Sequence, residues 1–102
     1  MKIEVTRTED ATLIEVKGEV DLYSSPELRK AVLKEVPKAD AAVEVHLGDV
    51  SYMDSSGVAT LVEGLRSANQ HGTTFTLVAP SSAVLKVLEL SRLDRVFEVR
   101  TD

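Results

Sequence analysis

The sequence predicts a single α/β domain in which a mixed, mainly parallel β-sheet carries helices packed on it. Two observations lead to this class. Segments with the two-residue alternation of strands are interleaved with segments whose apolar residues recur every three or four positions, as on the buried face of a helix. Their order is ββαβαβαβ, and a strand, a helix and a strand in succession form a unit with two parallel strands.

The chain opens with two predicted strands. Residues 2–7 and 11–17 both alternate between polar and apolar side chains. The polar turn at residues 8–10 is short, which favours an antiparallel hairpin between the two strands. Residues 18–23 then form an irregular link.

A helix is predicted after this link. Ser24 or Ser25 can cap its N-terminus, and Pro26 suits its first turn. Apolar residues recur at helical spacing over positions 28–36, and Pro37 ends the helix.

The middle of the chain adds a second strand–helix pair. Residues 41–47 are a predicted strand, and the polar residues after it lead into a loop over residues 50–57. Apolar residues spaced over positions 58–65 mark an amphipathic helix. Gly72 provides the glycine that commonly follows a helix C-terminus.

The last part of the chain repeats the alternation. Residues 73–79 are β-branched and apolar, as expected of a strand. Residues 80–82 open a third helix, whose apolar side chains extend over positions 84–90. Residues 96–99 form a short final strand. Short right-handed crossovers place the helices of consecutive strand–helix–strand units on one face of the sheet.

Composition limits what the protein does. With 102 residues the chain forms one domain, residues 1–102, whose core consists mainly of Val, Leu, Ile and Ala. A net charge of −5 argues against a nucleic-acid surface, and the lack of cysteine excludes disulfides and thiolate metal sites. We find neither a membrane span nor a signal peptide, so we expect a cytoplasmic protein without direct membrane insertion.

The loop over residues 50–57, between the strand and the helix of the second pair, carries the main candidate site. Asp54, Ser55, Ser56 and Gly57 lie where free backbone N–H groups and the positive end of the helix dipole meet. Such a position tolerates a phosphate, so a serine held there is a candidate phosphorylation site. Because parallel neighbouring strands end at the same edge of a sheet, we expect Asp21 to lie near Ser55.

Purely structural interpretations remain open for the same residues. Asp54 or Ser55 can serve as an N-cap, and Gly57 can simply give room for close packing in the first helical turn. Asp21 can be a turn former.

The sequence does not favour an enzyme. His46 and His71 have no neighbouring ligands at metal-binding spacing, so no metal site or cofactor is predicted. Neither histidine is expected near Ser55, and a serine nucleophile needs an adjacent base. Gly57 stands alone, so there is no glycine-rich phosphate loop and no catalytic residue is assigned.

Three segments, residues 18–21, 49–58 and 85–94, resemble those of a STAS domain, and more narrowly of bacterial anti-sigma factor antagonists. The resemblance extends from about residue 3 to residue 99. It implies a partner-switching module that is not itself an enzyme. The unphosphorylated form binds an anti-sigma factor that is also a serine kinase, and the sigma factor is thereby released.

In this resemblance the serine directly after the motif aspartate is the phosphoacceptor, which is Ser55 here, and a serine phosphatase reverses the modification. Asp21 and Asp54 match family aspartates beside that serine, and we assign partner binding to Asp21, Asp54, Ser55, Ser56 and Gly57. The alternative is a STAS subunit that docks on the ATPase of a membrane-associated lipid-transport ABC complex. The sequence is compatible with a homo-oligomer but does not require one.

Overall fold

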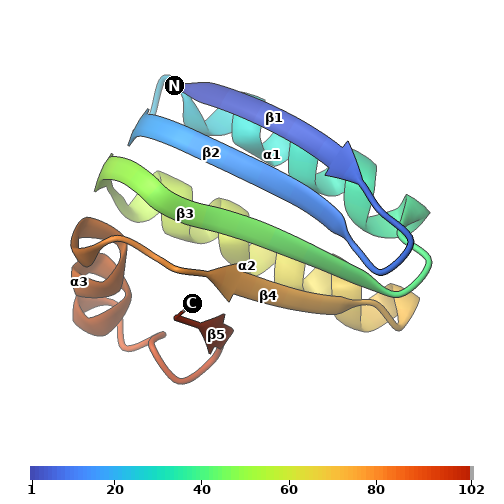
Figure 1. The fold of residues 1–102 in the computed structure, drawn as a ribbon. Helices are drawn as coiled ribbons and strands as arrows, with labels where there is room; N and C mark the ends of the chain where they lie inside the picture. The colour runs from blue at the N-terminus through green and yellow to red at the C-terminus, as the bar shows by residue number, and fades with distance from the viewer. Residues whose placement is uncertain (102) are drawn as a thin grey trace.

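A computed structural model describes residues 1–101 and confirms the predicted α/β class and element order (Figure 1). In this part of the chain, five strands form one sheet, and three α-helices and a short 3₁₀ helix connect them. The elements are β1 (Lys2–Arg7), β2 (Thr12–Val20), α1 (Ser25–Glu35), the 3₁₀ helix (Val36–Lys38), β3 (Ala42–Met53), α2 (Ser55–His71), β4 (Thr74–Val78), α3 (Ser82–Leu90) and β5 (Glu98–Arg100).

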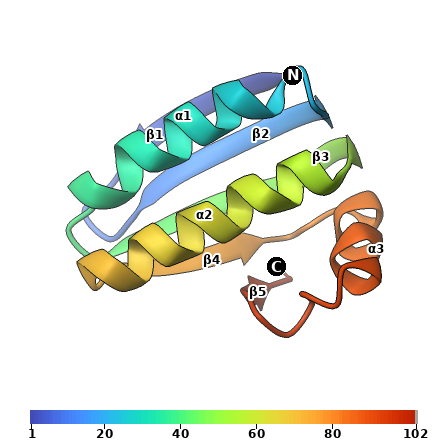
Figure 2. The same ribbon diagram turned by 180° about the vertical axis from the view of Figure 1, so that it is seen from behind.

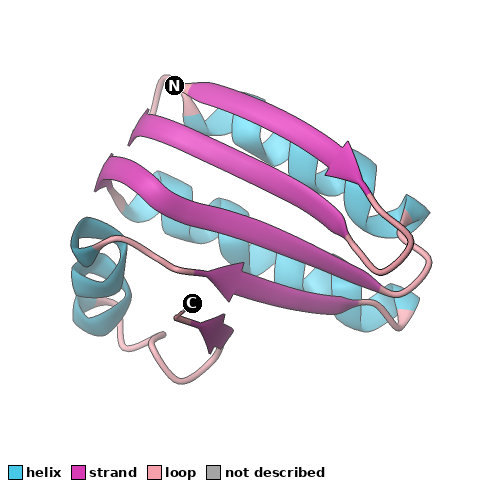
Figure 3. Ribbon diagram, viewed as in Figure 1, coloured by secondary structure: helices cyan, strands magenta, loops and turns pink. Residues whose placement is uncertain are grey.

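The strands lie side by side in chain order, with β1 antiparallel to β2 and the other neighbours parallel. Since successive crossovers join neighbouring strands with the same hand, α1 and α2 cover the same face, as predicted (Figure 2). No helix within residues 1–101 covers the opposite face of the sheet (Figure 3). Helix α3 lies at one end of the molecule, beside the last part of β3.

The core lies between the sheet and the helices α1 and α2, and it is aliphatic as the composition predicts. Two phenylalanines, Phe75 and Phe97, are its only buried aromatic side chains within residues 1–101. No helix in that part of the chain is both long and apolar enough to span a bilayer. The largest fully buried side chains are Ile14, Val16, Val20, Leu28, Val32, Val36, Val43, Val45, Leu47, Leu61, Leu77 and Leu88.

The strands β2 and β3 are longer than the sequence predicts. The predicted strand ends at residues 17 and 47 are wrong, because β2 continues to Val20 and β3 to Met53. Two register shifts, one on each side of the segment Lys17–Gly18, let the pairing continue through residues that normally end a strand. Gly18 adopts a positive φ of 98° there, which a glycine tolerates. The extension carries the ends of both strands beyond the rest of the sheet.

The C-terminus of α3 places an arginine in an unfavourable conformation. Arg92 has a φ of 57°, and its N–H donates to the Glu89 carbonyl while the Leu93 N–H donates to the Leu88 carbonyl. This is the Schellman arrangement, in which glycine is the usual residue at the left-handed position.

We therefore expect Arg92→Gly to raise the free energy of unfolding by about 1 kcal/mol, since it removes the clash of a Cβ in the left-handed region. Urea denaturation measures the change. Arg92→Ala is the matched control, because it removes the same side chain but keeps the Cβ, and it should give no such gain. Equal effects of the two variants would contradict this explanation.

Candidate functional site

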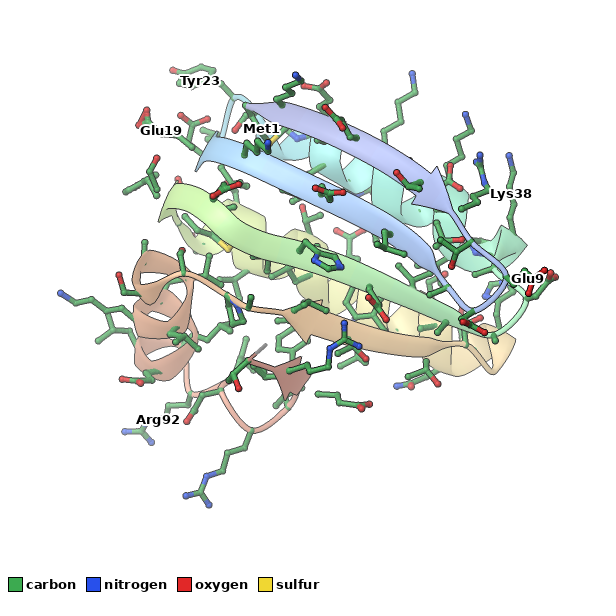
Figure 4. All side chains as sticks on the ribbon, in the orientation of Figure 1. Met1, Glu9, Glu19, Tyr23, Lys38 and Arg92 are labelled. Carbon is green, nitrogen blue, oxygen red and sulfur yellow. The ribbon has the colours of Figure 1, made fainter. Side chains whose placement is uncertain are left out.

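The ends of β2 and β3 bring the two predicted acidic loops together. Val20 pairs with Met53 across the parallel strands, and the Asp54 N–H donates to the Val20 carbonyl at 3.2 Å. Asp21 and Asp54 each follow these paired residues directly. The structure thus brings Asp21 to the same end of the sheet as Ser55. In Figure 4 this end carries the labelled side chains of Glu19 and Tyr23.

Asp54 is the N-cap of α2. Its backbone is extended, with φ −112° and ψ −171°, and its Oδ1 accepts the Ser56 N–H at 2.9 Å. The Ser56 hydroxyl donates to the same oxygen at 2.5 Å. Of the two capping residues that the sequence left open, Asp54 is therefore the one that caps, since its carboxylate satisfies an N–H that the helix itself leaves free.

The two serines differ in what their hydroxyls contact. Ser56 is partly buried, and its hydroxyl is bound to Asp54. Ser55 is the first residue of α2 and is exposed, and within residues 1–101 its hydroxyl makes no hydrogen bond. Sequence alone does not separate two adjacent hydroxyls. In the structure, Ser55 is the one that is accessible to a modifying enzyme.

Gly57 has a packing role in the first turn of α2. A Cβ at this position would lie 2.7 Å from the Met53 Cγ and 2.9 Å from the Val20 Cγ1, which is closer than side chains approach each other. The helix therefore sits directly on the last residues of both strands. Gly57 itself is buried, so it shapes the site from beneath.

We expect Gly57→Ala to lower the free energy of unfolding by about 1–3 kcal/mol, the usual cost of overpacking a well-packed region. The substitution would otherwise favour the helix by about 1 kcal/mol, because alanine has the higher helix propensity. Chemical denaturation with circular dichroism detection gives the value. A stabilised variant would show that the helix does not pack closely on the strands.

Asp21 organises the loop between β2 and α1. Its Oδ1 accepts the N–H groups of Tyr23 at 2.9 Å and Ser24 at 3.0 Å, and its own N–H donates to the Ser24 hydroxyl oxygen at 2.9 Å. The hydrogen bond from the Ser24 backbone lowers the pKa of the Asp21 carboxyl group, and burial opposes that shift only in part. A structural turn role, which the sequence left open, is thus present.

Ser24 is the site residue whose role the sequence analysis missed. The predicted capping role of its side chain is wrong, because Ser24 occupies the N-cap position of α1 but makes no side-chain capping bond to that helix. Its hydroxyl oxygen lies 2.9 Å from the Glu19 carbonyl oxygen and 3.1 Å from Asp21 Oδ1. The three-residue spacing from Asp21 to Ser24 is the sequence signal for such a turn.

The lowered pKa of Asp21 makes a pH-dependent prediction. A depressed carboxyl pKa contributes stability that is present above the unfolded value of 3.8 and is lost as the pH falls through the lower folded value. Asp21→Asn keeps a side-chain oxygen acceptor but removes the charge. We expect this variant to be less stable than the wild type at pH 7, with a difference that shrinks below pH 3.8. Urea denaturation across pH measures it, and a constant difference would contradict the assignment.

Neither histidine can act on Ser55. His46 lies within β3 on the open face of the sheet, where its Nε2 is 3.2 Å from Glu44 Oε1. His71 is the last residue of the 17-residue helix that Ser55 begins, so the two lie roughly 24 Å apart at about 1.5 Å per residue. The predicted separation of the histidines from Ser55 is thus confirmed.

A small α/β domain with an exposed serine at a capped helix N-terminus is therefore the class that the fold and site define. The family model described as "Mlab, STAS domain" matches residues 3–100. The chain belongs to the STAS domain family, as its sequence motifs indicated.

Known proteins agree with this assignment. The anti-sigma-B factor antagonist of Bacillus subtilis is 29% identical over 101 residues, a match covering 97% of this chain and 90% of that protein. The structure of unphosphorylated SpoIIAA, an anti-sigma factor antagonist, superposes with a TM-score of 0.81 at 22% identity, covering 99% of this chain and 90% of that one. The phosphorylated form of the Bacillus cell fate determinant SpoIIAA gives 0.75 at 22% identity, covering 99% and 93%. These two structures share the fold of this chain.

Proposed function

We propose that this chain is an anti-sigma factor antagonist that works as one domain over residues 1–102 in the cytoplasm. In its unphosphorylated form it binds an anti-sigma factor that is also a serine kinase, and the sigma factor is released. That kinase phosphorylates Ser55, a serine phosphatase removes the phosphate, and the chain itself performs no catalysis. The free, exposed Ser55 hydroxyl at the capped start of α2 is the observation that carries the proposal.

The relatives support this role. The similar Bacillus subtilis protein is named an anti-sigma-B factor antagonist. SpoIIAA has been solved in both unphosphorylated and phosphorylated forms, and both have the fold of the present chain. A switch that leaves the fold intact therefore fits a protein of this shape.

Electrostatics explain how a phosphate at Ser55 would control binding. A phosphoserine carries roughly −1.5 to −2 charges at neutral pH. The positive end of α2 offsets part of that charge, so the fold survives. A partner docked across the loop would meet the phosphate together with Asp21 and Asp54, and like charges buried at an interface cost several kcal/mol.

The family match also supports a second candidate function. The matching family model is described as Mlab, and not as an antagonist. The chain could therefore act as a STAS subunit docked on the ATPase of a lipid-transport ABC complex. An exposed phosphoacceptor serine has no required role in such a subunit, so phosphorylation of Ser55 distinguishes the two functions.

The decisive test is phosphorylation of the purified protein. We expect incubation with ATP and the histidine-kinase-like anti-sigma factors of the same genome to add one phosphate, located on Ser55 by fragmentation mass spectrometry. Ser55→Ala should abolish the modification, whereas Ser56→Ala should leave it in place. A folded protein that takes no phosphate from any candidate would favour the transport-associated subunit.

Binding provides a second readout of the same site. Ser55→Ala should keep full affinity for the anti-sigma factor. Ser55→Glu should weaken binding by about 10- to 100-fold, or roughly 1.4–2.8 kcal/mol, because a charge replaces the hydroxyl. Isothermal titration calorimetry measures both, and equal affinities for the two variants would exclude a charge-operated switch.

A further inference from the structure

Exposed apolar side chains gather around the candidate site. Four large ones belong to segments at the Ser55 end: Tyr23 and Leu22 are 91% and 68% exposed, Leu90 is 76% exposed and Tyr52 is 48% exposed. Exposed apolar patches rimmed by polar residues commonly mark interaction sites. The large exposed apolar side chains within residues 1–101 are Val5, Leu22, Tyr23, Tyr52, Leu85, Leu90 and Val96.

One part of this surface is a groove between the end of β3 and α3. It has a volume of about 340 Å³ and is lined by Tyr52, Met53, Ala83, Lys86, Val87 and Leu90. Met53 links the groove to the start of α2, because the same side chain packs against Gly57. The groove therefore lies beside the turn that presents Ser55.

The other part is the exposed pair Leu22 and Tyr23 in the loop after β2. The hydrogen bond from the Tyr23 N–H to Asp21 fixes the backbone that carries this pair. Figures 1 and 4 place the loop and α3 on opposite sides of the β3 end. The pair and the groove thus flank the ends of β2 and β3.

The surface between these two apolar parts is acidic. Asp21 and Asp54 directly follow the paired strand ends, and Glu19 is exposed beside them. Hydrogen bonds from the protein backbone hold both aspartate carboxylates in place. A matching partner surface needs a cation at its centre and apolar side chains on both sides.

We propose that this end of the sheet, where β2 and β3 end, binds a folded protein partner at two points. The partner surface has a central Lys or Arg flanked by apolar side chains. One point is the pair Leu22 and Tyr23, and the other is the groove beneath Leu90. The proposal rests on the proposed function and identifies what determines partner affinity at that same site. A tyrosine that can become buried at an interface is a frequent contributor of binding energy.

The acidic centre favours a protein over a membrane as the occupant. Anionic lipid headgroups would be repelled by Asp21, Asp54 and Glu19, and the chain as a whole carries a net charge of −5. A single partner cation is already matched by two aspartates. A phosphate on Ser55 would then add negative charge that the interface does not neutralise.

The test compares exposed apolar residues inside and outside this surface. We expect Tyr23→Ser and Leu90→Ser each to weaken binding of the cognate anti-sigma factor at least tenfold by isothermal titration calorimetry. Val96→Ser and Leu85→Ser are the matched controls, since they remove exposed apolar side chains that line neither the groove nor the Asp21 loop, and they should change affinity less than twofold. Thermal melts verify that all four variants fold.

The outcomes separate this inference from the proposed function. If the wild-type protein binds no anti-sigma factor, the function is wrong. If the wild type binds and Ser55→Glu binds at least tenfold more weakly, but Tyr23→Ser and Leu90→Ser bind normally, only the two-point docking is overturned. If the wild type binds phosphatidylglycerol vesicles and both Tyr23→Ser and Leu90→Ser lose that binding, the occupant of this surface is a membrane instead. A wild-type dimer that either variant makes monomeric would identify a second copy of the chain.

Discussion

The parallel pairing of β2 with β3 is the constraint on which the whole site depends. The pairing of β3 with β4 ends at His46, but its pairing with β2 continues to Met53 through two register shifts. The last backbone link, from the Asp54 N–H to the Val20 carbonyl, sets the start of α2 next to the Asp21 loop. Were the strands to separate earlier, the two acidic segments would have no fixed relation.

The same mismatch of strand lengths creates the groove. Beyond the end of β4, the last part of β3 has no strand on that side, and α3 packs there instead. The Ser81 hydroxyl donates to the Val50 carbonyl at 2.6 Å, and the Ser81 N–H donates to the Leu47 carbonyl at 3.2 Å. These bonds satisfy strand groups that would otherwise lack a partner. The groove lined by Tyr52 lies where α3 packs beside this part of β3.

Sequence patterns predicted every strand and α-helix of residues 1–101, because alternation and helical spacing reflect which face each segment buries. They placed the strand ends wrongly, since Gly18 and Gly48 favour turns locally and only pairing between β2 and β3 keeps both segments within the strands. The nearness of Asp21 to Ser55 followed from parallel topology alone. The choice of Ser55 over Ser56 came only from the family resemblance, because residue patterns do not show which hydroxyl turns back to the cap.

The two aspartates hold local structure and shape the surface at once, and this explains why a phosphate could act without refolding the domain. Asp54 binds the first turn of α2, and Asp21 binds its own loop, so both charges are fixed before any partner arrives. A phosphate on Ser55 would sit at a helix end that stabilises anions, which limits its effect on the fold. Docking of a partner would remove water from the phosphate, Asp21 and Asp54. The free-energy cost of this desolvation therefore falls on binding. Under the proposed function, rigid negative charge at this end would make binding, and not folding, the step that phosphorylation of Ser55 controls.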